Sequence, residues 1–103
     1  MKLAISIGHS PNHRGASCQG FTEYQECAII VGLLASYTGG YIVGTGTLAH
    51  KVAQINDGNY DAAIEVHLNA GGGQGSETLF SPGSKAGHAL ATRIENNMRM
   101  EYH

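Results

Sequence analysis

The sequence predicts a single α/β domain in which helices flank a mainly parallel sheet. Short apolar segments of strand character alternate along the chain with longer segments of helical spacing, and glycine-containing turns separate them. Strands that alternate with helices are joined by crossovers, which make neighbouring strands parallel. The chain has 103 residues, which is the length of one domain with a modest hydrophobic core.

The first two elements are a buried strand over residues 2–8 and a helix that is capped by Thr22 and runs to about residue 37. The strand segment alternates large apolar residues with small ones. Thr22 and Gln25 fit the capping-box pattern, which marks the start of a helix. Residues 10–21 between the two elements are expected to form a loop.

The rest of the chain predicts three further strands and two further helices. Apolar residues at helical spacing indicate the helices, and runs of strand character indicate the strands. In chain order these are a strand over residues 41–44, a helix from Leu48 to a stop at Gly58, strands over residues 61–68 and 76–80, and a helix capped by Ser84 with Ala86, Leu90, Ile94 and Met98 along one face.

Composition and charge argue against several classes of protein. A net charge of −2 without runs of like charge gives no basis for binding nucleic acid or an anionic membrane. The longest apolar run, residues 28–35, is far too short to span a bilayer. The first five residues alternate like a strand and do not resemble a signal peptide. The spacing of Cys18 and Cys27 is not that of a zinc finger, so reduced thiols are expected, with a disulfide or a metal role as the alternatives.

Three residues at the ends of predicted elements form a candidate catalytic metal site. His9 and His67 each lie at the carboxyl end of a strand, and Glu23 lies at the start of a helix. Parallel strands end at the same edge of a sheet, where α/β proteins usually place their sites. Two histidines and one carboxylate are the ligands expected of a catalytic zinc ion that keeps one position open for water.

Each of the three residues also has a plainer interpretation when it is taken alone. His9 can be a loop histidine, and Glu23 can be a carboxylate favoured by the helix dipole. His67 is harder to explain by packing, because the other face of its strand carries the apolar residues. Competing motifs are weak: the glycines of residues 71–75 lack the Lys-Ser/Thr sequel of a phosphate loop, and no Gly-x-Ser-x-Gly segment favours a serine hydrolase.

Glu65 shares a strand face with His67, two residues away. Three interpretations stay open for it: a general base, a residue that contacts a metal ligand or the substrate, or a buried carboxylate paired with a basic group. The glycine-rich loop over residues 70–75 directly follows the same strand. It is therefore expected to border the substrate groove.

The motifs together resemble the zinc-dependent N-acetylmuramoyl-L-alanine amidases of the type 3 family, and most closely the amidase domains of bacteriophage endolysins. The resemblance covers essentially the whole chain in the family's order. The segments that carry it are Ile5-Ser6-Ile7-Gly8-His9-Ser10, Gly15-Ala16, Gly20-Phe21-Thr22-Glu23-Tyr24, His67-Leu68-Asn69-Ala70 and Gly75-Ser76-Glu77.

The resemblance implies that His9, Glu23 and His67 bind zinc. It implies an enzyme that cleaves the amide between the lactyl group of N-acetylmuramic acid and L-alanine in peptidoglycan, and hence bacteriolytic degradation of the cell wall. Asn69 and Glu77 are the implied substrate contacts. Such a protein is made in the cytoplasm without a signal peptide and reaches the wall by holin-type release or host lysis.

In the family, a catalytic glutamate lies on a further strand near the end of the domain, beyond the point that corresponds to His103. On this comparison, residues 1–103 are the N-terminal portion of an amidase-like catalytic domain and lack the family's last strand and helix. They are expected to bind metal yet turn over slowly, and to form a homodimer or join a complementing C-terminal fragment that covers apolar surface around Leu90 and Ile94. The alternative function is a non-catalytic, zinc-containing remnant that binds peptidoglycan. A flavodoxin-like regulatory domain has no motif in its favour.

Overall fold

The computed structural model describes residues 1–9, 17–18, 20–43, 46–68, 78–79 and 82–102. Its contacts divide the chain into two units, residues 1–70 and residues 71–103. The first unit contains a three-stranded parallel sheet and two helices, and the second contains one helix. The predicted α/β class with a parallel sheet is thereby confirmed.

The sheet of the first unit has β1 (Leu3–Ile7) at its centre. The short strand β4 (Tyr41–Ile42) pairs with one edge of β1 and β5 (Ala62–Val66) pairs with the other, both in parallel. The pairing with β5 extends over all five residues of β1. The carboxyl ends of β1 and β5 therefore lie side by side at one edge of the sheet, as the sequence predicted.

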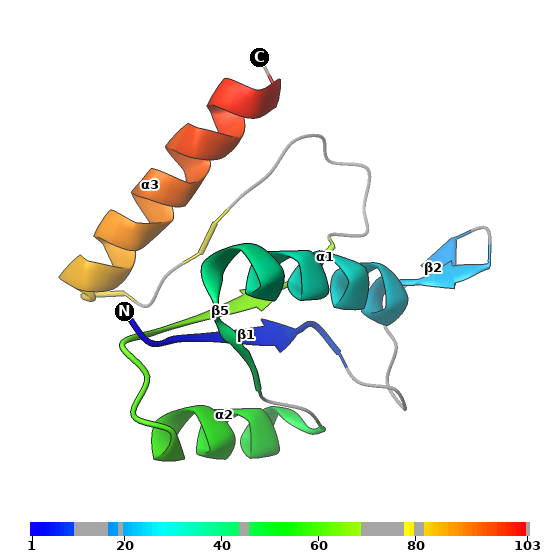
Figure 1. Ribbon diagram of the computed structural model, residues 1–103, viewed down its shortest axis with the longest axis horizontal. Helices are drawn as coiled ribbons and strands as arrows, with labels where there is room; N and C mark the ends of the chain where they lie inside the picture. Colours follow the sequence, from blue (N-terminus) through cyan, green and yellow to red (C-terminus); the bar gives the residue numbers. More distant parts are fainter. Residues whose placement is uncertain (10–16, 19, 44–45, 69–77, 80–81, 103) are drawn as a thin grey trace. The chain divides into compact units, whose positions relative to one another are not determined.

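Helices α1 (Glu23–Thr38) and α2 (Leu48–Asp57) lie on opposite sides of this sheet (Figure 1). The predicted capping box of α1 is present: the Gln25 amide donates to Thr22 Oγ1 at 3.2 Å, and the Thr22 amide donates to Gln25 Oε1 at 2.9 Å. Gly39 ends α1 in the left-handed conformation, which glycine adopts without strain. Both predicted helices of this unit are confirmed.

A short antiparallel hairpin was not predicted. The strands β2 (Ser17–Cys18) and β3 (Phe21–Thr22) lie within and just after the segment that the sequence assigned to a loop. Gly20 lies in the turn between them with φ +85°. Two strands of two residues each give too short an alternation for sequence periodicity to detect.

The second unit contains α3 (Lys85–Tyr102). Ser84 caps this helix as predicted, because its hydroxyl oxygen accepts from the Gly87 amide at 2.9 Å. The Thr78 hydroxyl donates to Glu95 Oε1 at 2.6 Å within the same unit. Of the strand predicted over residues 76–80, the structure describes only residues 78 and 79, and neither is in a strand.

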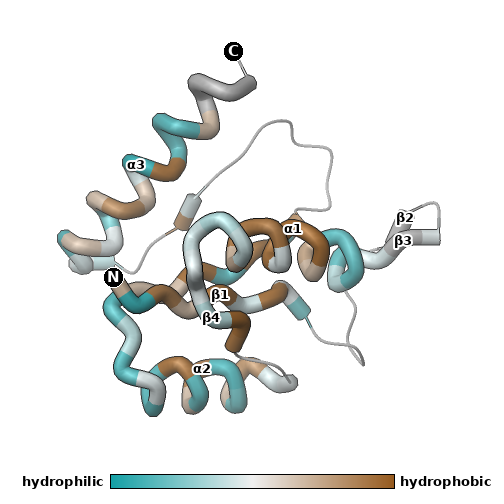
Figure 2. Tube along the Cα trace, viewed as in Figure 1, coloured by the Kyte–Doolittle hydropathy of each residue, from teal (hydrophilic) through white to brown (hydrophobic). Residues whose placement is uncertain are grey.

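The core of the first unit lies between β1 and α1. Ile5 of β1 and Cys27 and Val31 of α1 are almost completely buried. Helix α1 is also apolar on its outer side (Figure 2), where Ile29 and Leu33 are exposed. No described helix is long and apolar enough to cross a membrane.

Candidate metal centre

The structure brings His9, Glu23 and His67 together from three separate segments. One potential ligand atom of each residue lies within 4.8 Å of the other two. Glu23 Oε2 is 3.1 Å from His9 Nε2 and 3.2 Å from His67 Nδ1. The two imidazole rings stand nearly perpendicular, with an interplanar angle of 85°. The predicted convergence of these three side chains is thus observed.

The parallel pairing of β1 with β5 explains why the two histidines meet. Ile7 pairs with Val66 in the last register position, so the next residues of both strands leave the sheet together. The Gly8 amide donates to the Val66 carbonyl at 2.8 Å, which extends the pairing by one bond. His9 then turns with φ +65°, an uncommon backbone conformation for a residue other than glycine.

Glu23 enters the site as the first residue of α1, directly after its cap. Its side chain is only 7% exposed, and its Oε2 also accepts from the Leu68 amide at 3.2 Å. The positive end of the helix dipole favours a carboxylate at this position. The buried carboxylate is therefore held by the helix end and by one backbone amide, and it faces both imidazole rings.

These distances fit three ligands arranged around one metal ion. Bonds of 2.0–2.1 Å at tetrahedral angles place neighbouring ligand atoms about 3.3 Å apart. The two distances from Glu23 Oε2 are close to this value. The third edge of the triangle, between the histidine nitrogens, is at most 4.8 Å. The residues present could therefore hold a metal ion with small side-chain movements.

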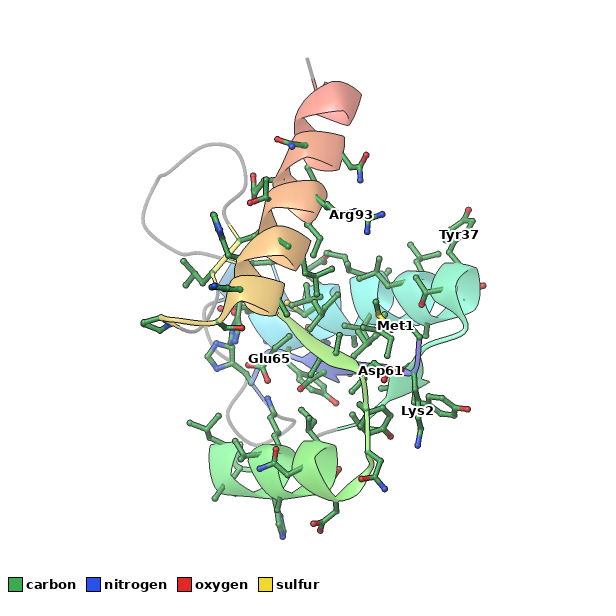
Figure 3. All side chains as sticks on the ribbon, turned by 90° about the vertical axis from the view of Figure 1, so that its left-hand side faces the viewer. Met1, Lys2, Tyr37, Asp61, Glu65 and Arg93 are labelled. Carbon is green, nitrogen blue, oxygen red and sulfur yellow. The ribbon has the colours of Figure 1, made fainter. Side chains whose placement is uncertain are left out.

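Glu65 is not one of the three clustered residues, but it contacts the outer nitrogen of His67. Its Oε1 is 2.5 Å from His67 Nε2, while its Oε2 accepts from the Ser6 hydroxyl at 2.9 Å and lies 3.4 Å from Lys51 Nζ. Ser6 and Glu65 are register partners on the neighbouring strands β1 and β5. Figure 3 shows the Glu65 side chain on the side of the sheet that faces α2.

The environment of Glu65 favours its ionised form. Partial burial by itself raises the pKa of this carboxyl group, but hydrogen bonds from Ser6 and His67 and the positive charge of Lys51 outweigh the burial. The net result is a pKa below the usual value. Glu65 thus contacts both a basic group, Lys51, and a candidate metal ligand, His67, but the expected burial is wrong because its side chain is 30% exposed. The role of general base stays a prediction.

Sequence reasoning missed Lys51. This residue is only 5% exposed in the middle of α2, although a lysine on a short amphipathic helix usually points to solvent. Its ammonium group donates to the backbone oxygens of Ile7 at 2.7 Å and His9 at 2.8 Å. The only available signal was the expectation that a buried Glu65 has a basic partner, which did not identify the partner.

Two predicted substrate contacts, Asn69 and Glu77, lie outside the described residues, as does the loop over residues 70–75. Cys27 is a free, buried thiol, in agreement with the expectation of reduced cysteine at this position. Burial raises the pKa of the Cys27 thiol, and the negative charge of Glu23 raises it further.

Comparison with protein families, curated proteins and solved structures gives no match to this chain.

Proposed function

We propose that this chain is a zinc-dependent amidase that hydrolyses the bond between N-acetylmuramic acid and L-alanine in bacterial peptidoglycan. The observation that carries the metal-dependent part is the convergence of His9, Glu23 and His67 at one edge of the sheet. The order of the amidase-like segments along the sequence supports the reaction and the substrate class.

The chemistry of the donor atoms favours zinc over harder cations. Two imidazole nitrogens and one carboxylate form a ligand set typical of catalytic zinc sites. Mg²⁺ and Ca²⁺ prefer sites built from oxygen ligands alone. Because Glu23 is the single negative ligand in the described cluster, a divalent ion would keep a positive charge.

When bound, the ion supplies a Lewis acid for the amide carbonyl and lowers the pKa of a water molecule. The three residues of the cluster would bind and orient the ion. His9 and His67 offer imidazole nitrogens from two adjacent strand ends, and Glu23 is fixed between them by the start of α1. The exposed side of His67, whose side chain is 46% accessible, leaves the cluster open to a substrate.

The test is digestion of purified peptidoglycan by residues 1–103. Cleavage of this amide creates a free amino group on L-alanine, which chemical labelling and mass spectrometry of the fragments detect. Because a positioned proton acceptor contributes about 10²–10⁴-fold to rate and the family's late glutamate is not among these residues, long incubations are needed. We expect slow release that a chelator abolishes and added zinc restores.

The His67→Ala variant provides the matched background. Release of L-alanine amino groups equal to that background, from a chain loaded with zinc, would contradict the amidase proposal. If the loaded chain then still sedimented with peptidoglycan, the alternative of a wall-binding module would be favoured instead.

A further inference from the structure

Lys51 holds a buried positive charge beside the candidate metal centre. A buried ammonium group is costly unless its donors are satisfied. Lysine has three N–H donors, and the structure gives Nζ three oxygen neighbours: the carbonyls of Ile7 and His9, and Glu65 Oε2 at 3.4 Å. The side chain therefore crosses from α2 to the end of the sheet and is fixed there.

The two carbonyls belong to the turn that carries the first histidine. Ile7 ends β1, and His9 adopts the left-handed conformation two residues later. Such a conformation costs energy in residues other than glycine and persists where surrounding contacts hold it. The Lys51 ammonium binds the carbonyl before this turn and the carbonyl within it, so it fixes the direction in which His9 leaves the strand.

The carboxylate of Glu65 connects Lys51 to the second histidine. A carboxylate only accepts hydrogen bonds, so its contact with His67 Nε2 requires the proton on that nitrogen. The other nitrogen, Nδ1, lies 3.2 Å from Glu23 Oε2, and with a metal ion bound between these two atoms it would offer its lone pair to that ion. Hydrogen bonds from a carboxylate to a metal-binding histidine fix its tautomer and ring orientation in this way.

We propose that Lys51 is a positioning residue that sets both histidines of the metal centre at once, His9 through its carbonyl and His67 through Glu65. The inference rests on the metal centre of the proposed function, but not on its substrate. In this arrangement Glu65 acts through His67 rather than on the substrate. The Ser6 hydroxyl, which also donates to Glu65, completes the support from β1.

The experiment compares zinc affinity among variants of the full 103-residue chain by competition with a chromophoric chelator. Lys51→Met keeps most of the side-chain volume and removes the charge, and Lys85→Met is the matched control because Lys85 is exposed at the start of α3. Loss of a group that orients a metal ligand typically weakens binding about 10–100-fold. We expect such a loss for Lys51→Met and for Glu65→Gln, and none for Lys85→Met.

Two further measurements separate positioning from general loss of structure. The visible absorption spectrum of the cobalt-substituted protein reports ligand geometry, and it should change in Lys51→Met. Nitrogen-15 NMR of the unmodified, zinc-loaded chain should show the His67 proton on Nε2, a result that does not depend on any variant folding. The double variant of Lys51→Met and Glu65→Gln should lose less zinc affinity than the product of the two single losses, because Lys51 acts on His67 through Glu65.

Affinity and cobalt spectrum unchanged in Lys51→Met, or a His67 proton on Nδ1 in the zinc-loaded chain, would overturn the inference. Neither result bears on peptidoglycan cleavage, which can fail while these positioning effects are observed. Absence of zinc binding by the unmodified chain would instead overturn the metal centre and this inference with it.

Discussion

Gly8 lies directly against His67, which follows the neighbouring strand β5. A Cβ atom at Gly8 would be 2.7 Å from His67 Nδ1. The same atom would lie 2.4 Å from the Val66 carbonyl oxygen, which is backbone and cannot rotate away. The close approach of β1 and β5 at the metal centre thus depends on the absence of a side chain at this position.

Replacing Gly8 by alanine should therefore both destabilise the fold and weaken metal binding. Forcing an extra methyl group into a packed site typically costs about 1–3 kcal/mol. Urea unfolding measures the first effect, and zinc competition measures the second. Gly32→Ala is the control, because a Cβ there meets nothing within 4 Å and alanine favours a helix over glycine by up to about 1 kcal/mol. A Gly8→Ala chain with unchanged stability and zinc affinity would contradict the packing described.

The two acidic residues in the first turn of α1 allow a matched test of Glu23. Glu23 and Glu26 both interact with the helix dipole, but only Glu23 belongs to the metal cluster. Glu23→Gln should lower zinc affinity by more than about 100-fold, since it removes a ligand rather than the support of one. Glu26→Gln should leave the affinity unchanged. Equal losses in the two variants would assign the effect to the helix dipole.

Metal analysis of the purified protein tests the stoichiometry. We expect one zinc ion per chain, and a large loss of bound zinc in His67→Ala because the ring supplies a ligand atom. His50→Ala is the comparison, since His50 is exposed on α2 and is not part of the cluster. The same zinc content in His67→Ala as in the unmodified chain would refute the assignment.

The buried thiol of Cys27 predicts a response to alkaline pH. Its folded-state pKa is raised above the reference of 9.0, first by burial and then by the charge of Glu23. The thiol therefore contributes stability that is fully present below pH 9.0 and is lost as the pH rises through the folded pKa. Cys27→Ala should lower stability at neutral pH by removing buried volume, but its unfolding free energy should decline less steeply above pH 9.0 than that of the unmodified chain.

Alkylation followed by mass spectrometry of the Cys27 peptide gives an independent measurement. The thiolate is the reactive form, so a raised pKa and burial should make Cys27 react slowly in the folded protein and rapidly in urea. Fast alkylation in the folded protein would show that the thiol is accessible.

The local signals at Gly8–His9 and at the α1 cap were strong enough to predict much of the site. A strand that ends in Gly-His, a capping box at Thr22 and a strand that ends at His67 fix the positions of the three candidate ligands relative to their elements. Parallel connection then brings the strand ends together, and the structure shows that pairing. These predictions depend on short-range patterns, which sequence carries well.

The contacts of Lys51 next to the site could not be predicted in the same way. Lys51 is buried while Leu48 and Val52, two of the large apolar residues of its helix, are exposed by 73% and 49%. Hydrophobic periodicity places the apolar residues of a helix inward. Here three oxygen acceptors from distant segments draw the charged residue inward instead. Such a preference is a property of tertiary structure, and no local pattern encodes it.

The central position of β1 also determines when this site forms during synthesis. β1 is the first strand of this sequence, but its longest pairing is with β5, whose register partners lie 59 residues later. At the usual rate of about 5–20 residues per second, a ribosome needs roughly 3–12 s to proceed from His9 to His67. During that interval one side of the apolar segment Leu3–Ile7 has no partner strand, and His9 lacks His67, the other histidine of the cluster. In the finished fold β4 and α1 also pack against β1, so they can cover it before β5 is made. The candidate metal centre can be completed only after His67 has been synthesised.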